Sequence, residues 1–202
     1  RLDSIFSSPN PAWPERAVTE VATHSLGKML DQAKNKGELK PYLRNLNVRW
    51  FSFDLSDLLS MRFLPSEAER YTAVKGDVLV CEGGYPGRAA IWTADEPVYF
   101  QKALHRVRFK EIELNKWFVY HLFWQDKTGR LNQYFSGTGI QHFTGETLAR
   151  YRLPIPPLSD VRQAISQIDR LSQEVQRLES IYQAKIAALD ELKKSLLHQA
   201  FN

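Results

Sequence analysis

The most regular hydrophobic pattern in this 202-residue chain lies near its C-terminal end. Apolar residues recur there every seven positions in two series, and the second series is broken only at Lys185. Two such series form the a/d seam of a coiled coil, which here is sustained over about four heptads. The predicted seam residues are Ile168, Leu171, Val175, Leu178, Tyr182, Leu189, Leu192 and Leu196.

The segment 158–202 contains neither glycine nor proline, which predicts one uninterrupted helix. Pro157 precedes this segment, and Ser159 stands at the expected N-cap. A helix of about 40 residues spans about 60 Å, whereas a domain of ~150 residues is only about 40 Å across. The seam therefore requires a partner helix, which is either a second copy or another segment of a longer chain. The heptad pattern by itself leaves parallel and antiparallel pairing open.

Residues 1–157 carry mixed patterns that are typical of an α+β domain. Residues 103–109 alternate between two faces and predict a strand, and the turn at 75–77 leads into a short buried strand at 78–80. Helices are predicted at 54–61, 115–125 and 144–150, and loops at 31–40, 82–88 and 136–139. We therefore predict a globular mixed α/β domain at 1–157, followed by one long coiled-coil helix at 158–202.

The charge distribution changes this picture only slightly. The formal net charge is +4, and the helical segment holds equal numbers of acidic and basic residues, so the whole excess lies in residues 1–157. This suits a polyanion such as nucleic acid, but it suits a mildly basic enzyme equally well. The single cysteine allows no intrachain disulfide and favours a reducing cytoplasm. No run approaches the ~20 apolar residues of a membrane span, so no membrane partner is expected.

No catalytic or metal-binding motif is found in the sequence. The phosphate-binding loop, the dinucleotide fingerprint and the His-Glu-x-x-His and Cys-x-x-Cys zinc patterns are all missing. His121 and Cys81 are interpreted as buried core residues, and Gly83, Gly84 and Gly87 as turn formers. We expect the chain to bind rather than to react, with no catalytic residue, no metal ligand and no cofactor of its own.

Several short stretches recur in the order known from one protein family. They lie at 27–31, 40–48, 75–84, 86–91, 100–107, 137–142 and 153–158, and the long helix ends in a further one at 192–201. Each stretch is weak alone, but their order, with the helix last, resembles one half of the specificity subunit of type I restriction-modification enzymes. The resemblance spans Trp13 to Phe201. The family usually carries two such halves in tandem, whereas this sequence shows one and no internal repeat.

This resemblance implies a function that the composition alone does not give. The globular part would be a target-recognition domain that reads one half of a bipartite site in double-stranded DNA. The long helix would pair antiparallel with a second one and act as a spacer. Methyltransferase subunits carrying S-adenosylmethionine would methylate adenine, and ATP- and Mg²⁺-dependent restriction and translocase subunits would add cleavage, all in the cytoplasm of a prokaryote.

The candidate DNA contacts are basic and amide side chains of the globular part. Basic residues would neutralise phosphates, whereas Arg, Lys, Asn or Gln at loop tips would read base edges. For Arg88 the sequence leaves open whether it pins its own loop or touches a phosphate. The candidates are Lys28, Lys34, Asn35, Lys36, Arg44, Arg88, Lys102, Arg106, Lys127, Arg130, Asn132 and Gln133.

Two other functions compete with this interpretation. A coiled-coil scaffold that presents a protein-binding domain would dimerise without affinity for DNA, and the small charge excess allows it. An enzyme with an unrecognised site, such as a nuclease, would need clustered carboxylates near a lysine, and the missing motifs make it the weakest alternative.

Overall fold

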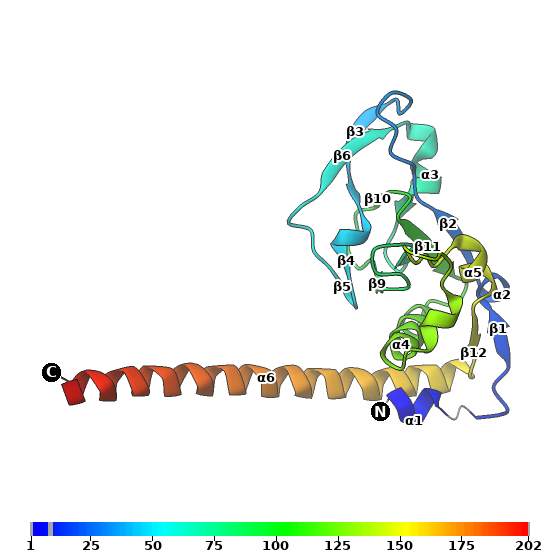
Figure 1. Ribbon diagram of the computed structural model, residues 1–202. Coiled ribbons are helices and arrows are strands. Elements are labelled where there is room, and N and C mark those ends of the chain that lie inside the picture. Colours follow the sequence, from blue (N-terminus) through cyan, green and yellow to red (C-terminus); the bar gives the residue numbers. More distant parts are fainter. Residues whose placement is uncertain (1, 8–9, 202) are drawn as a thin grey trace. The chain divides into compact units, whose positions relative to one another are not determined.

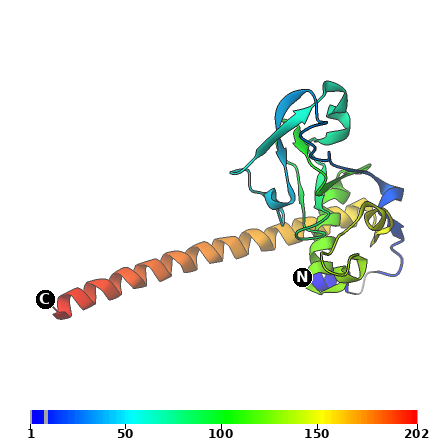
Figure 2. The same ribbon diagram turned by 45° about the horizontal axis from the view of Figure 1, so that its top comes forward.

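The computed structural model describes residues 2–7 and 10–201. The chain divides into two compact units, Arg1–Val161 and Arg162–Asn202. The first unit holds the strands and short helices (Figure 1), and the second consists of one uninterrupted helix (Figure 2). The predicted fold class, a mixed α/β globular part followed by a long C-terminal helix, is confirmed.

One four-stranded sheet is antiparallel throughout. Its order is β2 (Ala22–Leu26), β11 (Leu104–Phe109), β8 (Val78–Cys81) and β9 (Ala89–Ile91). The alternation predicted for 103–109 is present in β11, where Val107 is fully buried and Arg106 and Arg108 are partly exposed. Arg108 donates from Nε and Nη2, both at 2.7 Å, to the buried carboxylate of Asp77 in the turn before β8. The charge of Arg108 is therefore neutralised from a neighbouring turn.

The other four-stranded sheet is mixed. Its order is β6 (Leu59–Phe63), β3 (Glu38–Leu43), β10 (Val98–Phe100) and β7 (Thr72–Ala73), and only β10 and β3 run parallel. A hydrophobic core cluster joins the two sheets, since Leu43 and Phe100 of this sheet lie in it together with Leu79 and Leu104 of the first. Cys81 is fully buried in the same cluster, as expected, and burial raises the pKa of its thiol to about 11.

The longest helix of the globular unit is α4 (Glu113–Lys127), which confirms the buried aromatic helix predicted at 115–125. Trp117 and Phe118 are fully buried, and the Trp117 indole donates to the carbonyl of Pro154 at 2.8 Å. His121 is 4% exposed, its Nδ1 lies 2.8 Å from the Tyr151 hydroxyl, and burial lowers the pKa of its imidazole to about 3. It is a core histidine with a hydrogen-bond partner, as the sequence indicated.

Short elements complete the fold. The strand pairs are β1 (Glu15–Ala17) with β12 (Arg152–Pro154) and β4 (Val48–Arg49) with β5 (Ser52–Phe53). The remaining short helices are α1 (Leu2–Phe6), α2 (Val18–Val21), α3 (Ala68–Tyr71), α5 (Gly145–Arg150), η1 (Asn45–Asn47), η2 (Pro65–Glu67) and η3 (Arg130–Tyr134). Thr144 caps α5 by accepting from the amide of Thr147.

The helix predicted at 54–61 is wrong. Asp54 accepts hydrogen bonds from the amide and hydroxyl of Ser56, which stabilises a bend, and from Leu59 onward the chain joins the sheet as β6. Short polar side chains that bond to a nearby backbone amide favour a turn over a helix. The loop predicted at 31–40 also ends earlier, because Lys40 already belongs to β3.

The long helix α6 runs over Leu158–Phe201. Ser159 is not its N-cap, because the helix begins one residue earlier and the Pro157 carbonyl already accepts the amide of Val161 at 3.1 Å. Seven of the eight predicted seam residues have exposed fractions between 41% and 64%, whereas Ile168 is 6% exposed. From Leu171 onward the seam is therefore an uncovered apolar stripe.

We expect His105 to make the fold sensitive to acid. It is 1% exposed on β11, and burial lowers the pKa of its imidazole from 6.5 to about 4. The folded chain keeps this ring neutral while the unfolded chain protonates it, so the free energy of unfolding falls as pH drops from 6.5 towards 4. By pH 5 this one group costs about 2 kcal/mol.

Replacing His105→Leu removes that cost, so the difference in stability between pH 7 and pH 5 shrinks by about 2 kcal/mol. Urea unfolding of both chains at the two pH values measures it. An equal acid loss in the two chains would contradict the assignment. His121 titrates in the same direction, so part of the acid sensitivity persists.

Candidate nucleic-acid interface

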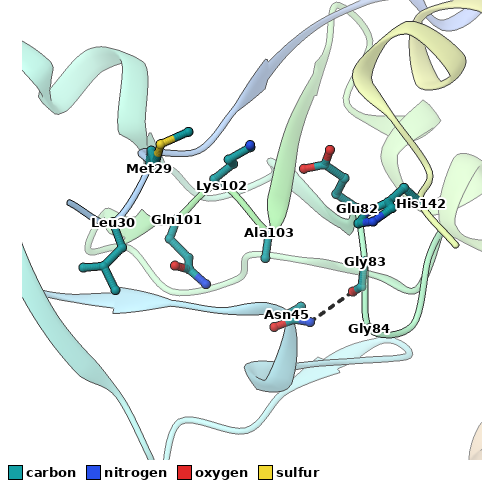
Figure 3. A pocket seen from close by; sticks show the side chains of 10 residues that line it. All are labelled: Met29, Leu30, Asn45, Glu82, Gly83, Gly84, Gln101, Lys102, Ala103 and His142. Carbon is teal, nitrogen blue, oxygen red and sulfur yellow. Dashed lines mark hydrogen bonds between the residues drawn. The ribbon is translucent and has the colours of Figure 1, made fainter. Parts of the chain in front are cut away.

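A pocket of about 410 Å³ with a mixed polar and apolar lining lies where several strands of the globular unit end. Residues that follow β2, β3 and β8 meet there with the turn between β10 and β11 (Figure 3). Loops at strand ends tolerate sequence change and carry binding residues on a fixed scaffold. The pocket is lined by Met29, Leu30, Asn45, Glu82, Gly83, Gly84, Gln101, Lys102, Ala103 and His142.

The floor of this pocket is fixed by backbone contacts between the two sheets. The amide of Lys28 donates to Phe100 at 3.2 Å, and that of Lys102 donates back to Lys28 at 2.9 Å. A β-carbon on Gly27 would lie 2.2 Å from the carbonyl oxygen of Gln101, so no larger residue fits without moving the backbone. The turn that carries Gln101 and Lys102 is therefore locked in place.

The loop at 82–88 forms one wall of the pocket. Gly84 and Gly87 have φ of 75° and 80°, which are conformations that glycine adopts without strain. The Asn45 side chain donates to the carbonyl of Gly83 at 3.0 Å and ties this loop to η1 (Figure 3). Arg88 donates to the Asn45 carbonyl at 3.1 Å and stacks 4.9 Å from the Tyr85 ring centroid. The glycines are turn formers, and Arg88 pins its own loop.

Three predicted contact residues have their charge engaged inside the protein. Lys28 is 7% exposed and pairs with Glu67, while its ammonium also donates to the Arg62 carbonyl at 3.0 Å. Arg44 pairs with Asp57 at 2.6 Å. Arg106 donates to the carbonyls of Glu69 and Thr72 at 2.9 and 2.6 Å. These three side chains hold elements together.

Three predicted lysines lie on the surface, and of these only Lys102 lines the pocket. Lys34, Lys36 and Lys102 are exposed, and Lys34 has only a loose ion pair, at 3.7 Å, with Asp31. Asn35 is partly buried. Its side-chain amide donates to the Met29 carbonyl at 3.1 Å and so stabilises the loop after β2. The loop therefore presents two lysine side chains on a backbone that Asn35 stabilises.

A second group of predicted residues lies at the end of α4 and on η3. Lys127, Arg130, Asn132 and Gln133 are all exposed. Arg130 stacks 4.6 Å from the centroid of the Trp124 ring, and Lys127 lies 5.3 Å from that of Phe123. The Tyr85 hydroxyl bonds to Asp126 at 3.4 Å, so the loop at 82–88 borders this group as well as the pocket.

The sequence did not single out Gln101, Met29, Leu30 or His142. Their signal was weak: all four lie within family-like stretches, at 27–31, 100–107 and 137–142, but nothing in those stretches marks them as binding residues. Met29 and Leu30 are 59% and 47% exposed, although both are large apolar residues. Only the folding of the chain brings these positions together.

Comparison with known proteins identifies the class. A family model described as "Type I restriction modification DNA specificity domain" matches residues 10–188. That is most of the chain, and the chain belongs to this family. No curated relative is detected by sequence.

Solved structures share the fold. The first belongs to a study of complex assembly and conformational transition of the type I R-M system, with a TM-score of 0.77 and 20% identity over 100% of this chain and 50% of that one. The HsdS subunit from Thermoanaerobacter tengcongensis has a TM-score of 0.65 and 20% identity, over 88% and 42% of the two chains. The type I S subunit from M. genitalium has a TM-score of 0.53 and 16% identity, over 86% and 43%. The chain thus spans about half the length of the solved subunits that it matches.

Within residues 2–7 and 10–201, no helix is long and apolar enough to cross a membrane. In the same part of the chain, no three His, Cys, Asp or Glu side chains are grouped so as to hold a metal ion.

We expect Lys28 and Lys34 to behave oppositely when each is replaced by methionine. Lys28→Met leaves the Glu67 carboxylate without its cation and should lower the free energy of unfolding by about 2 kcal/mol. Lys34→Met, on the exposed loop, should leave stability unchanged. Thermal unfolding of the two variants makes the comparison. Equal stability of the Lys28 variant and the parent would show that this ion pair is not a structural contact.

Proposed function

We propose that the chain is the DNA-reading component of a type I restriction-modification system, and that the strand-end surface around the pocket faces the duplex. The observation that carries this proposal is the family match over residues 10–188. The geometry supports it, because Lys102, Gln101 and Asn45 line a concavity between the two sheets. Exposed Lys34 and Lys36 lie further along the loop that carries Leu30 of that lining.

Lys34, Lys36 and Lys102 are the side chains we assign to phosphates. Each is exposed, and neutralising phosphates releases counterions, which makes affinity depend steeply on salt. Arg130, Asn132 and Gln133 form a second contact region at the far side of the loop 82–88. Lys28, Arg44, Arg88 and Arg106 contribute indirectly by fixing the loops.

The chemistry of methylation and cleavage belongs to partner subunits in this proposal. Methyltransferase subunits would supply S-adenosylmethionine, and restriction and translocase subunits would use ATP and Mg²⁺. This chain would contribute no catalytic residue and no cofactor, and it would act in the cytoplasm of a prokaryote by directing adenine methylation and restriction to a bipartite site.

The exposed seam of α6 supports pairing with a second long helix. In a parallel pair, d positions face each other, so Lys185 would lie against Lys185 of its partner. In an antiparallel pair, a faces d. The seam then pairs Leu171 with Leu196, Val175 with Leu192, Leu178 with Leu189, and Tyr182 with Lys185, all about one midpoint between Gln183 and Ala184.

Antiparallel pairing thus replaces the repulsion between two Lys185 side chains with a contact between Lys185 and the Tyr182 ring. The other three a/d pairs of the seam consist of apolar residues only. Within one chain the Lys185 ammonium already lies 5.9 Å from the Tyr182 ring centroid. The partner helix is a second copy of this chain, or the second half of a tandem chain. Two copies would read a symmetric interrupted site, whereas a tandem chain would read an asymmetric one.

The coiled-coil scaffold is the alternative, and DNA methylation separates the two. We expect the partner methyltransferase to modify a random duplex library at an interrupted adenine motif only when this chain is present. Sequencing of the modified sites provides the readout. If an active methyltransferase modified the same sites with and without this chain, the DNA-reading proposal would be refuted and the scaffold favoured.

Cysteine cross-linking tests the helix pair. Val175→Cys and Leu192→Cys chains, mixed in equal amounts, should cross-link to each other but not to themselves, because only the antiparallel pair brings these positions together. The natural Cys81 is fully buried and gives no background. Self-cross-linking of Val175→Cys would mean a parallel pair.

A disrupted seam is the matched control for that experiment. Leu178→Asp combined with Leu189→Asp places four carboxylates in the apolar layers of the pair, so sedimentation should show a monomer. A parent chain that is itself monomeric would assign the partner helix to another segment of a tandem chain.

A further inference from the structure

Gln101 is the polar side chain best placed to recognise a single base. It lies in the turn between β10 and β11, and Figure 3 shows its amide pointing into the space between Leu30 and Asn45. In the part of the chain that the structure describes, no hydrogen bond engages this amide group. It therefore offers one donor and one acceptor side by side.

The backbone beneath Gln101 cannot move freely. Its amide donates to the carbonyl of Leu43 at 3.1 Å, and its carbonyl accepts from Leu104 at 2.9 Å. A parallel bridge joins it to Lys28, and Gly27 packs against its carbonyl. A recognition group must be held to within a fraction of an ångström, and a support built from both sheets provides this.

Two other polar side chains of the pocket are engaged or directed elsewhere. The Asn45 side chain donates to Gly83 and accepts from the Leu46 amide, both at 3.0 Å, so both ends of its amide group are engaged. Figure 3 shows the Lys102 ammonium directed away from the Gln101 amide, on the side of the Glu82 carboxylate. The space that the Gln101 amide enters is therefore flanked by exposed Met29 and Leu30 and not by the ammonium that we assign to a phosphate. This chemistry fits a base edge better than a phosphate.

We propose that Gln101 reads an adenine in the major groove, with its amide bridging N6 and N7. This is the pairing that a glutamine makes best, because the amide acceptor and donor match the adenine amine and N7. The assignment rests on the proposed function and adds to it the residue that selects one base. It also ranks Gln101 above Gln133, which is exposed on η3 and does not line the pocket.

The test uses selection of a random duplex library by the full chain, followed by competition between the selected duplex and its single-position variants. Gln101→Leu should lose about 10- to 100-fold discrimination at one A·T pair. Its affinity for unselected duplex and the slope of that affinity against salt should stay unchanged, because phosphate contacts remain. Gln173→Leu, which changes an exposed glutamine of α6 outside the predicted seam, is the matched control and should keep the parent motif.

Gln101→Glu should change which base pair is preferred, and a residue with only a structural role would not produce such a change. A carboxylate accepts from the cytosine amine, so the preferred pair at that position should change from A·T to C·G. An unchanged motif in both Gln101 variants would overturn the assignment, as would the same loss of discrimination in Gln173→Leu. A parent chain that selects no motif and binds no duplex at low salt would instead refute the proposed function.

Discussion

The backbone contact between Gly27-Lys28 and Phe100-Gln101 is the constraint on which the recognition surface depends. It is the place where the strand β2 leaves the antiparallel sheet and pairs with the end of the mixed sheet. A side chain at position 27 would collide with the Gln101 carbonyl. The two sheets are therefore joined by main chain as well as by the shared core of Leu43, Leu79 and Phe100. A pocket built at this junction keeps its geometry while the loops around it differ in sequence.

The basic residues of the globular unit fall into two roles that charge alone does not separate. Lys28, Arg106 and Arg108 bond to carboxylates or carbonyls of neighbouring elements. Lys34 and Lys36 lie on an exposed loop. A modest net charge of +4 is therefore compatible with a polyanion partner, because part of the positive charge is used internally and the rest gathers at the loops.

The regular patterns predicted most of the architecture. The heptads of α6, the alternation of β11 and the aromatic run of α4 each reflect burial or pairing over many residues, so the sequence alone located them. The bend at Asp54 was misread as a helix, because a side-chain hydrogen bond to Ser56 decides it and apolar spacing does not reveal such a bond. The sequence did not identify Gln101 as a candidate contact for a different reason. It has no pattern of its own, and its position follows from five segments that meet only in the fold.

The absence of glycine and proline from α6 restricts how its length changes during evolution. Inserting one residue into an α-helix turns everything beyond it by about 100°, which would rotate the seam residues away from their partners. Seven residues preserve the apolar stripe and add about 10.5 Å. That increment is close to three base pairs of duplex DNA, since ten base pairs span about 34 Å. In the proposed arrangement of two recognition units joined by paired helices, a heptad insertion would therefore change the spacing of the half-sites by about three base pairs.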